Sequence, residues 1–317
     1  MLKKCLILLF ALLLFLFLLF NNRNFPVEKD SYLGWDVRRF QTTKAWELAK
    51  AIEDNDLQEI KHQVIDLKVP VDTRDRINDF TPLMFAVFNN NIQSVKALLD
   101  LGADPNLPTD SISDSGENSV IVACEYIGIS QEILKLLLKY GGNPNSTECG
   151  RNYDIEGDWT IARGTALGKA IHLSNYYEKD NFDKVRILVG AGADVNLRTE
   201  DSPVGVIERA LVLDRMDIVL YLLKHGADYK WRLEESDGEG NPYYEDILYR
   251  LRQSVFRLDS QQYKDKLKVI KFLKDRGLDY WKSPIPEYVI DVIKKQIKPK
   301  KNAELQYYLK RFLYSSI

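Results

Sequence analysis

Five segments of the chain end in nearly the same way. In each, a run of apolar residues leads to a glycine, and an Asp or Asn follows two residues later; the segments are 97–106, 136–145, 187–196, 221–229 and 272–280. The glycines are spaced 39, 51, 34 and 51 residues apart. Self-similarity at periods of about 20–50 residues is typical of repeat proteins, in which each unit buries its apolar face against its neighbours. We therefore predict stacked repeats, although a length of 317 residues alone would suggest two globular domains.

Each repeated segment has the pattern of a helix that ends at its glycine. Val95, Leu98 and Leu99 lie at positions i, i+3 and i+4, which places them on one helix face. Gly102 follows them because the residue after a helix often adopts a left-handed conformation, which glycine reaches without strain. Asp104 then begins a turn with its side-chain oxygen. The sister segments repeat this arrangement around Gly141, Gly192, Gly226 and Gly277.

A preceding helix begins at Thr81 and Pro82, which have the residue types of an N-cap and a first helical position. Asn90 stands at the turn between the two helices, where an Asn accepts a positive φ. Residues 81–86 together with 102–106 resemble an ankyrin repeat, although Met84 stands where that family usually carries His. The resemblance covers residues 46–282, with 46–72 as a degenerate first repeat. It implies an all-α ankyrin-repeat solenoid of about six helix-turn-helix repeats.

Residues 1–23 are predicted to be a signal anchor or transmembrane segment that forms an N-terminal hydrophobic helix. Residues 5–20 carry no charge and are mostly Leu and Phe, and Lys3 and Lys4 precede them. This length lies between a signal-peptide core of about 15 residues and a membrane span of about 20. No small residues suited to cleavage follow, which favours a single-pass segment that stays attached; a cleaved, exported form is the alternative. The positive-inside rule puts the repeats outside the cytoplasm.

Two further segments frame the repeats. Residues 24–45 are interpreted as a linker, and residues 283–317 as C-terminal capping helices. In the cap, amphipathic patterns at 286–297 and 303–314 flank the basic stretch 298–301. Docking of that stretch on a membrane surface is an alternative to its being a solvated face.

No motif for catalysis or cofactor binding is complete. Residues 164–170 resemble a phosphate-binding loop, but the spacing is one residue short and Ala170 replaces the Ser or Thr that holds magnesium. Residues 237–242 suggest a calcium loop, but Pro242 stands where the turn needs glycine. The three histidines lack metal-ligand spacing, and a net charge of −2 argues against nucleic acid. We expect no enzyme activity, no cofactor and no metal.

The insertions between repeats carry the candidate partner-binding residues. Insertions of this kind map to loops on one face of a repeat protein, and aromatic residues among charges are typical of interfaces. The candidates are Asp110, Asp114, Glu117, Trp159, Tyr176, Tyr177, Trp231, Glu234, Glu235, Asp237, Glu239, Tyr243 and Tyr244. For Trp231, packing in the core is an equal alternative. Cys124 and Cys149 are interpreted as free thiols, with a disulfide as the alternative in an oxidising compartment.

An export anchor with divergent repeats and long insertions is similar to the exported ankyrin-repeat proteins of bacteria. That resemblance implies a protein anchored in the bacterial inner membrane, with the repeats in the periplasm and another protein as the partner. Some members are type VI secretion immunity proteins that neutralise toxic effectors such as lipases. An envelope adaptor that stabilises a resident enzyme is the alternative, and an enzyme with an unrecognised site is a remote third.

Overall fold

The helices of the chain fall into two units, residues 1–166 and 167–317. The computed structural model describes residues 35–110, 112, 114–153, 159–173, 180–199, 205–236, 242–286, 288–289, 291, 307 and 310. The predicted hydrophobic segment at residues 5–20 lies outside these ranges. Within them, the structure contains no helix with the length and apolar character needed to cross a membrane.

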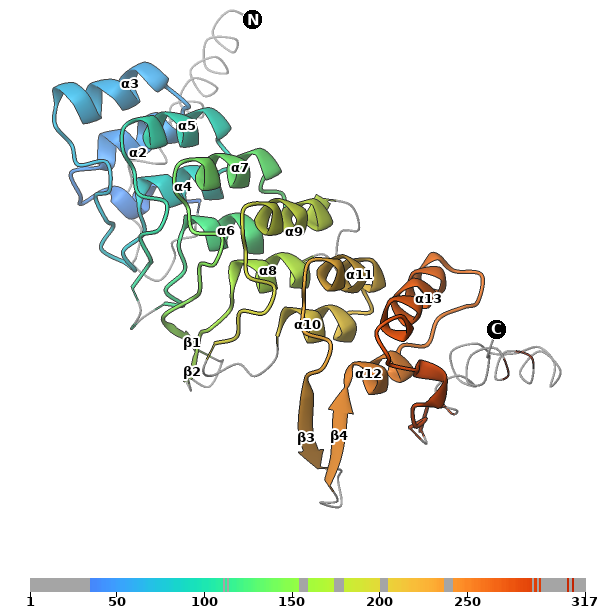
Figure 1. The fold of residues 1–317 in the computed structure, drawn as a ribbon. Helices are drawn as coiled ribbons and strands as arrows, with labels where there is room; N and C mark the ends of the chain where they lie inside the picture. The colour runs from blue at the N-terminus through green and yellow to red at the C-terminus, as the bar shows by residue number, and fades with distance from the viewer. Residues whose placement is uncertain are drawn as a thin grey trace, which may run out of the picture. The chain divides into compact units, whose positions relative to one another are not determined.

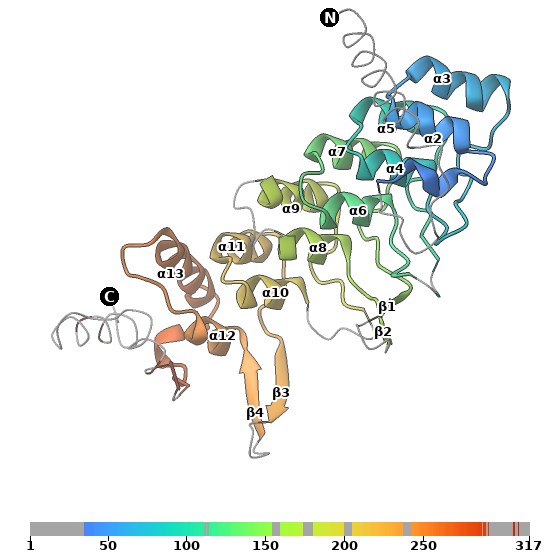
Figure 2. The ribbon, with the colours of Figure 1, turned by 180° about the vertical axis from the view of Figure 1, so that it is seen from behind.

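Unit 1 is built from pairs of antiparallel helices stacked in two layers. Helices α2, α4 and α6 pack side by side in one layer, and α3, α5 and α7 form the other (Figures 1 and 2). The elements are η3 (Val37–Phe40), α2 (Trp46–Glu53), α3 (Leu57–Lys61), η4 (His62–Asp66), α4 (Pro82–Phe88), α5 (Ile92–Asp100), α6 (Ser119–Glu125), α7 (Gln131–Lys139), β1 (Arg151–Tyr153) and β2 (Trp159–Ile161).

The helix boundaries in unit 1 are set by the residues that the sequence singles out. Thr81 caps α4 by accepting a hydrogen bond from the Met84 N–H at 3.2 Å, and Pro82 takes the first position. Asn90 turns the chain with a φ of 56°, and Gly102 ends the repeat with a φ of 92°. Leu83, Val95 and Leu98 are fully buried. The predicted helix-turn-helix unit is therefore confirmed here.

Side-chain hydrogen bonds join the turn of one repeat to the turn of the next. Asp104 Oδ1 accepts from the Asn106 N–H at 2.9 Å, which forms the predicted turn. Asn106 then donates its amide to the Gly141 carbonyl at 2.9 Å and accepts from the Asn143 N–H at 2.8 Å. In the first repeat, Asp72 accepts from the Asp104 N–H at 3.2 Å, so the degenerate unit takes part in the same ladder.

Unit 2 repeats the helix pairs. Helix α10 packs against α11 and α12, and α11 packs against α13. Its elements are α8 (Ala166–Leu173, whose first residue closes unit 1), α9 (Asp180–Gly190), α10 (Val206–Val212), α11 (Met216–Lys224), β3 (Arg232–Ser236), β4 (Pro242–Asp246), α12 (Ile247–Gln253), α13 (Gln261–Lys274) and η5 (Tyr280–Lys282). The ladder recurs, because Asn196 donates to the Gly226 carbonyl at 3.0 Å and accepts from the Asp228 N–H at 2.7 Å.

The described end of unit 2 buries two cations around one aromatic ring. Arg252 and Lys266 are 0% and 1% exposed. The Arg252 guanidinium lies 4.0 Å from the centroid of the Tyr280 ring and donates to the Tyr280 carbonyl at 2.7 Å. Lys266 Nζ donates to the Ser254 carbonyl at 2.9 Å. Val289, in the predicted capping region 283–317, is also fully buried.

The predicted helical repeat fold is confirmed, and two short hairpins are added that the sequence analysis did not predict. Two insertions pair as antiparallel hairpins: β1 with β2 in unit 1, and β3 with β4 in unit 2. Strand β4 carries two adjacent tyrosines, Tyr243 and Tyr244, and aromatic residues favour a pleated, half-exposed surface. The backbone N–H and C=O groups of these insertions are not in a helix, and pairing between two strands provides hydrogen-bond partners for them.

Candidate protein-binding surface

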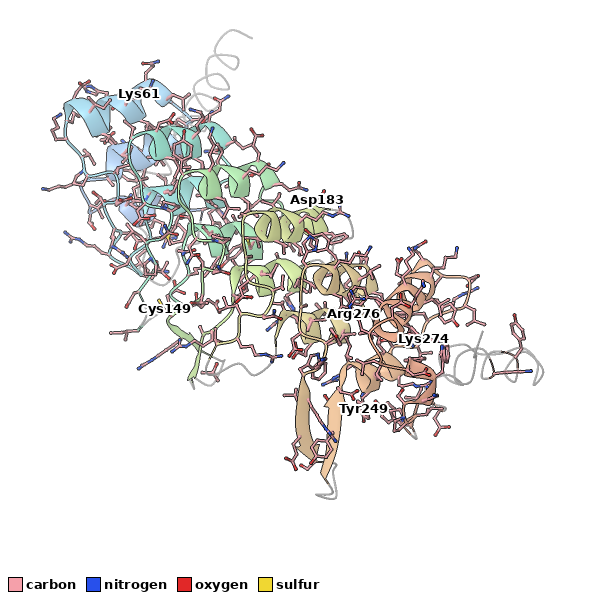
Figure 3. The ribbon with its side chains drawn as sticks, in the orientation of Figure 1. Lys61, Cys149, Asp183, Tyr249, Lys274 and Arg276 are labelled. Carbon is pink, nitrogen blue, oxygen red and sulfur yellow. The ribbon has the colours of Figure 1, made fainter. Side chains whose placement is uncertain are left out.

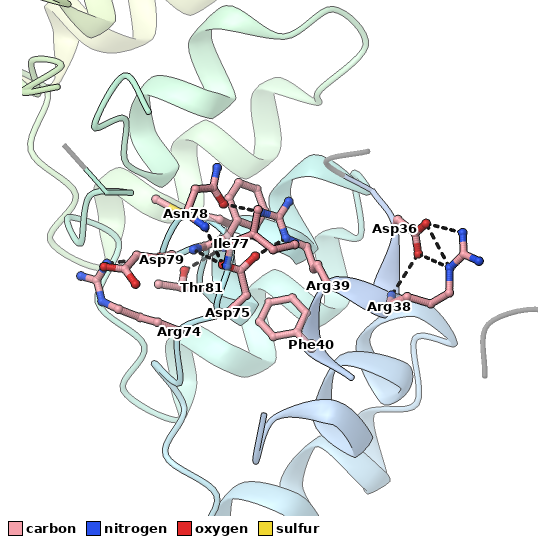
Figure 4. A network of polar contacts seen from close by, with 12 residues as sticks. Asp36, Arg38, Arg39, Phe40, Arg74, Asp75, Ile77, Asn78, Asp79 and Thr81 are labelled. Atoms are coloured by element: carbon pink, nitrogen blue, oxygen red, sulfur yellow. Dashed lines mark hydrogen bonds and ion pairs between the residues drawn. The ribbon is translucent and has the colours of Figure 1, made fainter. Parts of the chain in front are cut away.

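A buried ion pair organises the loop that leads into α4. Arg39 Nε donates to Asp75 Oδ2 at 2.5 Å, and the side chains are 5% and 0% exposed (Figure 4). The other oxygen of Asp75 accepts from the backbone N–H groups of Ile77, Asn78 and Phe80, each at 3.1 Å. One carboxylate therefore fixes both the loop and its attachment to η3.

The next loop along the stack is joined to the first. The Asp110 N–H donates to the Asn78 carbonyl at 2.8 Å, and the Asn78 amide donates to the Asp114 carboxylate. Arg74 reaches across to the Pro108 carbonyl at 2.7 Å. These contacts link segments more than 30 residues apart in the sequence, so the two loops form one surface.

A third loop completes the set. The Gly150 N–H donates to the Ser115 carbonyl at 2.8 Å, and the Arg151 N–H donates to the Asp114 carbonyl at 2.9 Å. The approach is close, because a Cβ on Gly116 would lie 2.7 Å from Cys149 Sγ. Figure 3 shows Cys149 among these loops and Lys61 away from them on α3. We call the described residues of 73–81, 107–118 and 147–165 the loop platform.

Aromatic side chains from the segment before the repeats and from two neighbouring repeats meet at the platform. The Phe88 ring lies 4.4 Å from the Tyr126 ring, 6.0 Å from Phe80 and 6.5 Å from Trp35, measured between centroids. Trp35 is 55% exposed, Phe88 and Tyr126 are partly exposed, and Phe80 is buried. These four residues are the aromatic cluster. The Arg39 guanidinium covers Phe80, 3.7 Å from its centroid.

A carboxylate lies at the Tyr126 end of the aromatic cluster. The Tyr126 hydroxyl donates to Glu117 Oε1 at 3.4 Å. Burial raises the pKa of Tyr126 above its ordinary value, and the charges of Glu117, Glu125 and Asp114 raise it further.

In unit 1, the structure brings three of the predicted site residues together. Asp110 and Asp114 lie in the loop platform, where Asp110 Oδ1 accepts from the Ile112 N–H at 2.9 Å. Glu117 is 5% exposed, so it supports Tyr126 from within and does not offer its own surface to a partner. The backbone of Trp159 pairs with Tyr153 in the β1–β2 hairpin. Tyr176 and Tyr177 lie outside the described residues.

In unit 2, the predicted residues divide between core and surface. Trp231 is 6% exposed, so its alternative as core packing is the one the structure favours. Glu234 is exposed on β3 and lies opposite Tyr244, which is 49% exposed. The Arg232 guanidinium covers the Tyr244 ring at 3.7 Å. The backbones of Glu235 and Tyr243 pair with each other. Asp237 and Glu239 lie outside the described residues.

Several residues of this surface were missed by the sequence analysis. Phe88 and Tyr126 stand at the carboxyl ends of α4 and α6, and their position after the helical apolar stripe was the available signal. Asp75 precedes the capping Thr81 by six residues, a short-range signal for a capped loop. Its pairing with Arg39 has no such signal.

In the part of the chain that is described, no group of three or more His, Cys, Asp or Glu side chains is placed to hold a metal ion. Cys124 is buried and Cys149 is exposed, and no disulfide joins them.

Stacked helix pairs with loops joined along one edge define a helical repeat protein. The family model described as ankyrin repeats, in three copies, matches residues 48–148 of this chain. The crystal structure of an ankyrin repeat domain from Acinetobacter baumannii AYE is 26% identical with a TM-score of 0.50, and the match covers 71% of this chain and 95% of that one.

Curated relatives match over shorter stretches. An ankyrin repeat protein of Rickettsia bellii is 33% identical over 113 residues, which are 35% of this chain and 15% of that protein. The ankyrin repeat, SAM and basic leucine zipper domain-containing protein 1 of Otolemur garnettii is 32% identical over 99 residues, which are 30% of this chain and 19% of that protein. The chain therefore matches less than a fifth of the length of these relatives.

Proposed function

We propose that this chain is a protein-binding module and that the loop platform with the aromatic cluster is its contact surface. Ankyrin repeats imply a protein–protein interaction module and are typically non-enzymatic. The observation that carries the proposal is the joining of three neighbouring loops through Asp75, Asn78 and Asp114. A surface that is already ordered loses little conformational entropy on binding, so more of the contact energy contributes to affinity.

The finer proposal is a module tethered to the bacterial inner membrane, with its repeats in the periplasm. It is supported by the uncharged segment 5–20 behind Lys3 and Lys4. In this setting the chain would act as an immunity protein that binds and neutralises a toxic effector, for which a secreted lipase is the example. An adaptor that stabilises a resident envelope enzyme is the second candidate.

Capture of the partner tests the proposal. The full chain, tagged after Ile317, should retain one protein in a one-to-one complex. Ile112→Ala removes a side chain that is 66% exposed in the loop platform, and we expect roughly fivefold weaker capture. Ile65→Ala is the matched control, because Ile65 is 49% exposed on η4. Equal capture by both variants would place the contact surface elsewhere.

The identity of the captured protein separates the two roles. An effector that is toxic when expressed without this chain supports immunity. A resident enzyme that loses stability without this chain supports the adaptor.

A further inference from the structure

The exposed side of α13 is rich in lysine. All of α13 (Gln261–Lys274) lies in the described part of the chain, and it holds five lysines and one Asp. Of the five lysines, Lys266 is buried and the other four are exposed. Helices α5 and α11 each hold one Lys and one Asp. In a chain whose net charge is −2, the exposed side of α13 is therefore a local positive surface.

The spacing of the exposed lysines places them opposite the core. Lys264, Lys268 and Lys271 follow one another at intervals of four and three residues, and Lys274 comes three residues later, so the four share one helix face. Leu267, which is 38% exposed, lies among them. The buried side of the helix packs against α11 and η5 (Figure 1). We call these four lysines and Leu267 the lysine face.

The ion pairs on the lysine face leave its ammonium groups accessible. Lys268 Nζ lies 2.7 Å from Asp265 Oδ1, and Lys271 Nζ lies 3.6 Å from Asp275 Oδ2. The two lysine side chains are nevertheless 58% and 78% exposed. Exposed pairs of this kind contribute little free energy, so an anion can bind beside the carboxylate or replace it at small cost.

The residue types on this side of α13 favour lipid phosphates over an acidic protein. Protein interfaces are depleted in lysine and enriched in Tyr, Trp and Arg, whereas the exposed positions of α13 hold Gln, Lys and Leu. Clusters of about 4–8 Lys or Arg on a helix are typical of binding to anionic lipids. The apolar stem of lysine can lie along an apolar surface while its ammonium stays in water, and Leu267 adds an apolar side chain beside those stems.

We propose that the lysine face of α13 docks on a membrane surface of anionic phospholipids. The ammonium groups bind the headgroup phosphates, and Leu267 contacts the boundary between headgroups and acyl chains. Each lysine near an anionic surface strengthens binding by about fivefold, so the four lysines together have a large effect. This inference rests on the proposed membrane attachment through residues 5–20, and it adds a second contact with the lipid.

Acetylation of lysines, measured by mass spectrometry, tests the docking in the full chain. The chain is reconstituted in nanodiscs of phosphatidylcholine, or of phosphatidylcholine mixed equally with phosphatidylglycerol, and N-hydroxysuccinimide acetate is the reagent. We expect the lysine face to react about threefold more slowly on the anionic nanodiscs, and high salt to abolish the difference. Lys96 is the internal control, because it is 56% exposed and pairs with Asp100 as Lys271 pairs with Asp275. Equal rates on the two kinds of nanodisc, or an equal slowing of Lys96, overturn the proposal.

A peptide distinguishes lipid from an acidic protein. Polyglutamate added to the phosphatidylcholine nanodiscs presents carboxylates without lipid phosphates. We expect it to slow acetylation of the lysine face by less than the anionic nanodiscs do. Equal or greater slowing by polyglutamate contradicts the lipid assignment and favours an acidic protein as the ligand.

Variants then locate the contact. Lys268→Gln with Lys271→Gln removes half of the charge of the lysine face, and the slowing at its two remaining lysines should fall to less than about 1.5-fold. Lys96→Gln with Lys135→Gln, at exposed positions on α5 and α7, is the matched control and should leave the slowing unchanged. Circular dichroism checks that both variants are folded. If the two double variants behave alike, α13 is not the docking surface.

The failure of this inference differs from the failure of the proposed function. If acetylation of the lysine face does not respond to anionic lipid, the lipid contact is wrong. Capture of the partner, and its loss in Ile112→Ala, would still stand. If no protein is captured, the proposed function fails, whatever the nanodiscs show.

Discussion

At the scale of single residues, Asp75 pairs with Arg39 and also binds three backbone N–H groups of its own loop. Asp75→Asn keeps an oxygen for the backbone N–H groups but turns an amide N–H toward Arg39, which then lies buried opposite another donor. Breaking a buried ion pair on one side costs about 3–5 kcal/mol. We expect urea unfolding to show a loss near that value. Asp100→Asn, at an exposed pair with Lys96, should change stability by less than about 0.5 kcal/mol.

Lys266 should make the stability of unit 2 depend on pH. Burial lowers the pKa of its ammonium well below the ordinary 10.5, and Arg252 lowers it further, while Asp214 opposes them. The Tyr280 ring also lies beside it, with its centroid 5.0 Å from Lys266 Nζ. Because the unfolded chain binds this proton more tightly, stability is lost at low pH and rises between the folded pKa and 10.5.

Removing the amine should therefore flatten the pH profile. We expect Lys266→Met to reduce the rise in unfolding free energy with pH, by up to about 1.4 kcal/mol per pH unit inside that window. Lys264→Met, at an exposed position on the same helix, is the control and should leave the slope as it is. Identical slopes for the parent chain and Lys266→Met would contradict the prediction.

At the scale of helices, the need for glycine after a repeat helix can be tested by comparing Gly192 with the nearby Gly190. Gly192 and Gly190 both have open space where a Cβ would stand, but only Gly192 has a positive φ, of 94°. Gly192→Ala should cost about 1–2 kcal/mol from left-handed strain. Gly190→Ala should be neutral or stabilising by up to about 1 kcal/mol, because Gly190 is the last residue of α9 and alanine has a higher helix propensity than glycine. Equal melting temperatures for the two variants would contradict the explanation by left-handed backbone strain at Gly192.

The contrast between local and distant contacts explains what the sequence could predict. Gly102, Asn90 and Thr81 act on their own turns and caps, so their neighbours in the chain reveal their roles. The Arg39–Asp75 pair joins positions 36 residues apart, and the aromatic cluster draws on residues from 35 to 126, with no period to connect them. For Trp231, the residue type is equally typical of a core and of an interface. The sequence could not choose between the two, and the exposed fraction of the side chain in the structure favours the core.

At the scale of the whole molecule, the net charge is only −2. On the described surface, opposite charges form pairs at short distance, such as Lys96 with Asp100 at 2.6 Å. Around Tyr126, by contrast, three carboxylates act on one ring. A partner that recognises charge would therefore respond to where the charges lie and not to their sum.

Membrane attachment is the prediction that concerns the whole chain. The full chain should stay in the membrane fraction after a carbonate wash, because residues 5–20 carry no charge. Leu12→Arg with Leu14→Arg places two charges near the middle of that segment, each costing about 2.5–3.5 kcal/mol on insertion, and should release the chain. Phe25→Arg, outside the segment, should not.

A reporter after Ile317 should be active only outside the cytoplasm, and a mature protein beginning near Asn22 would show that the segment is cleaved.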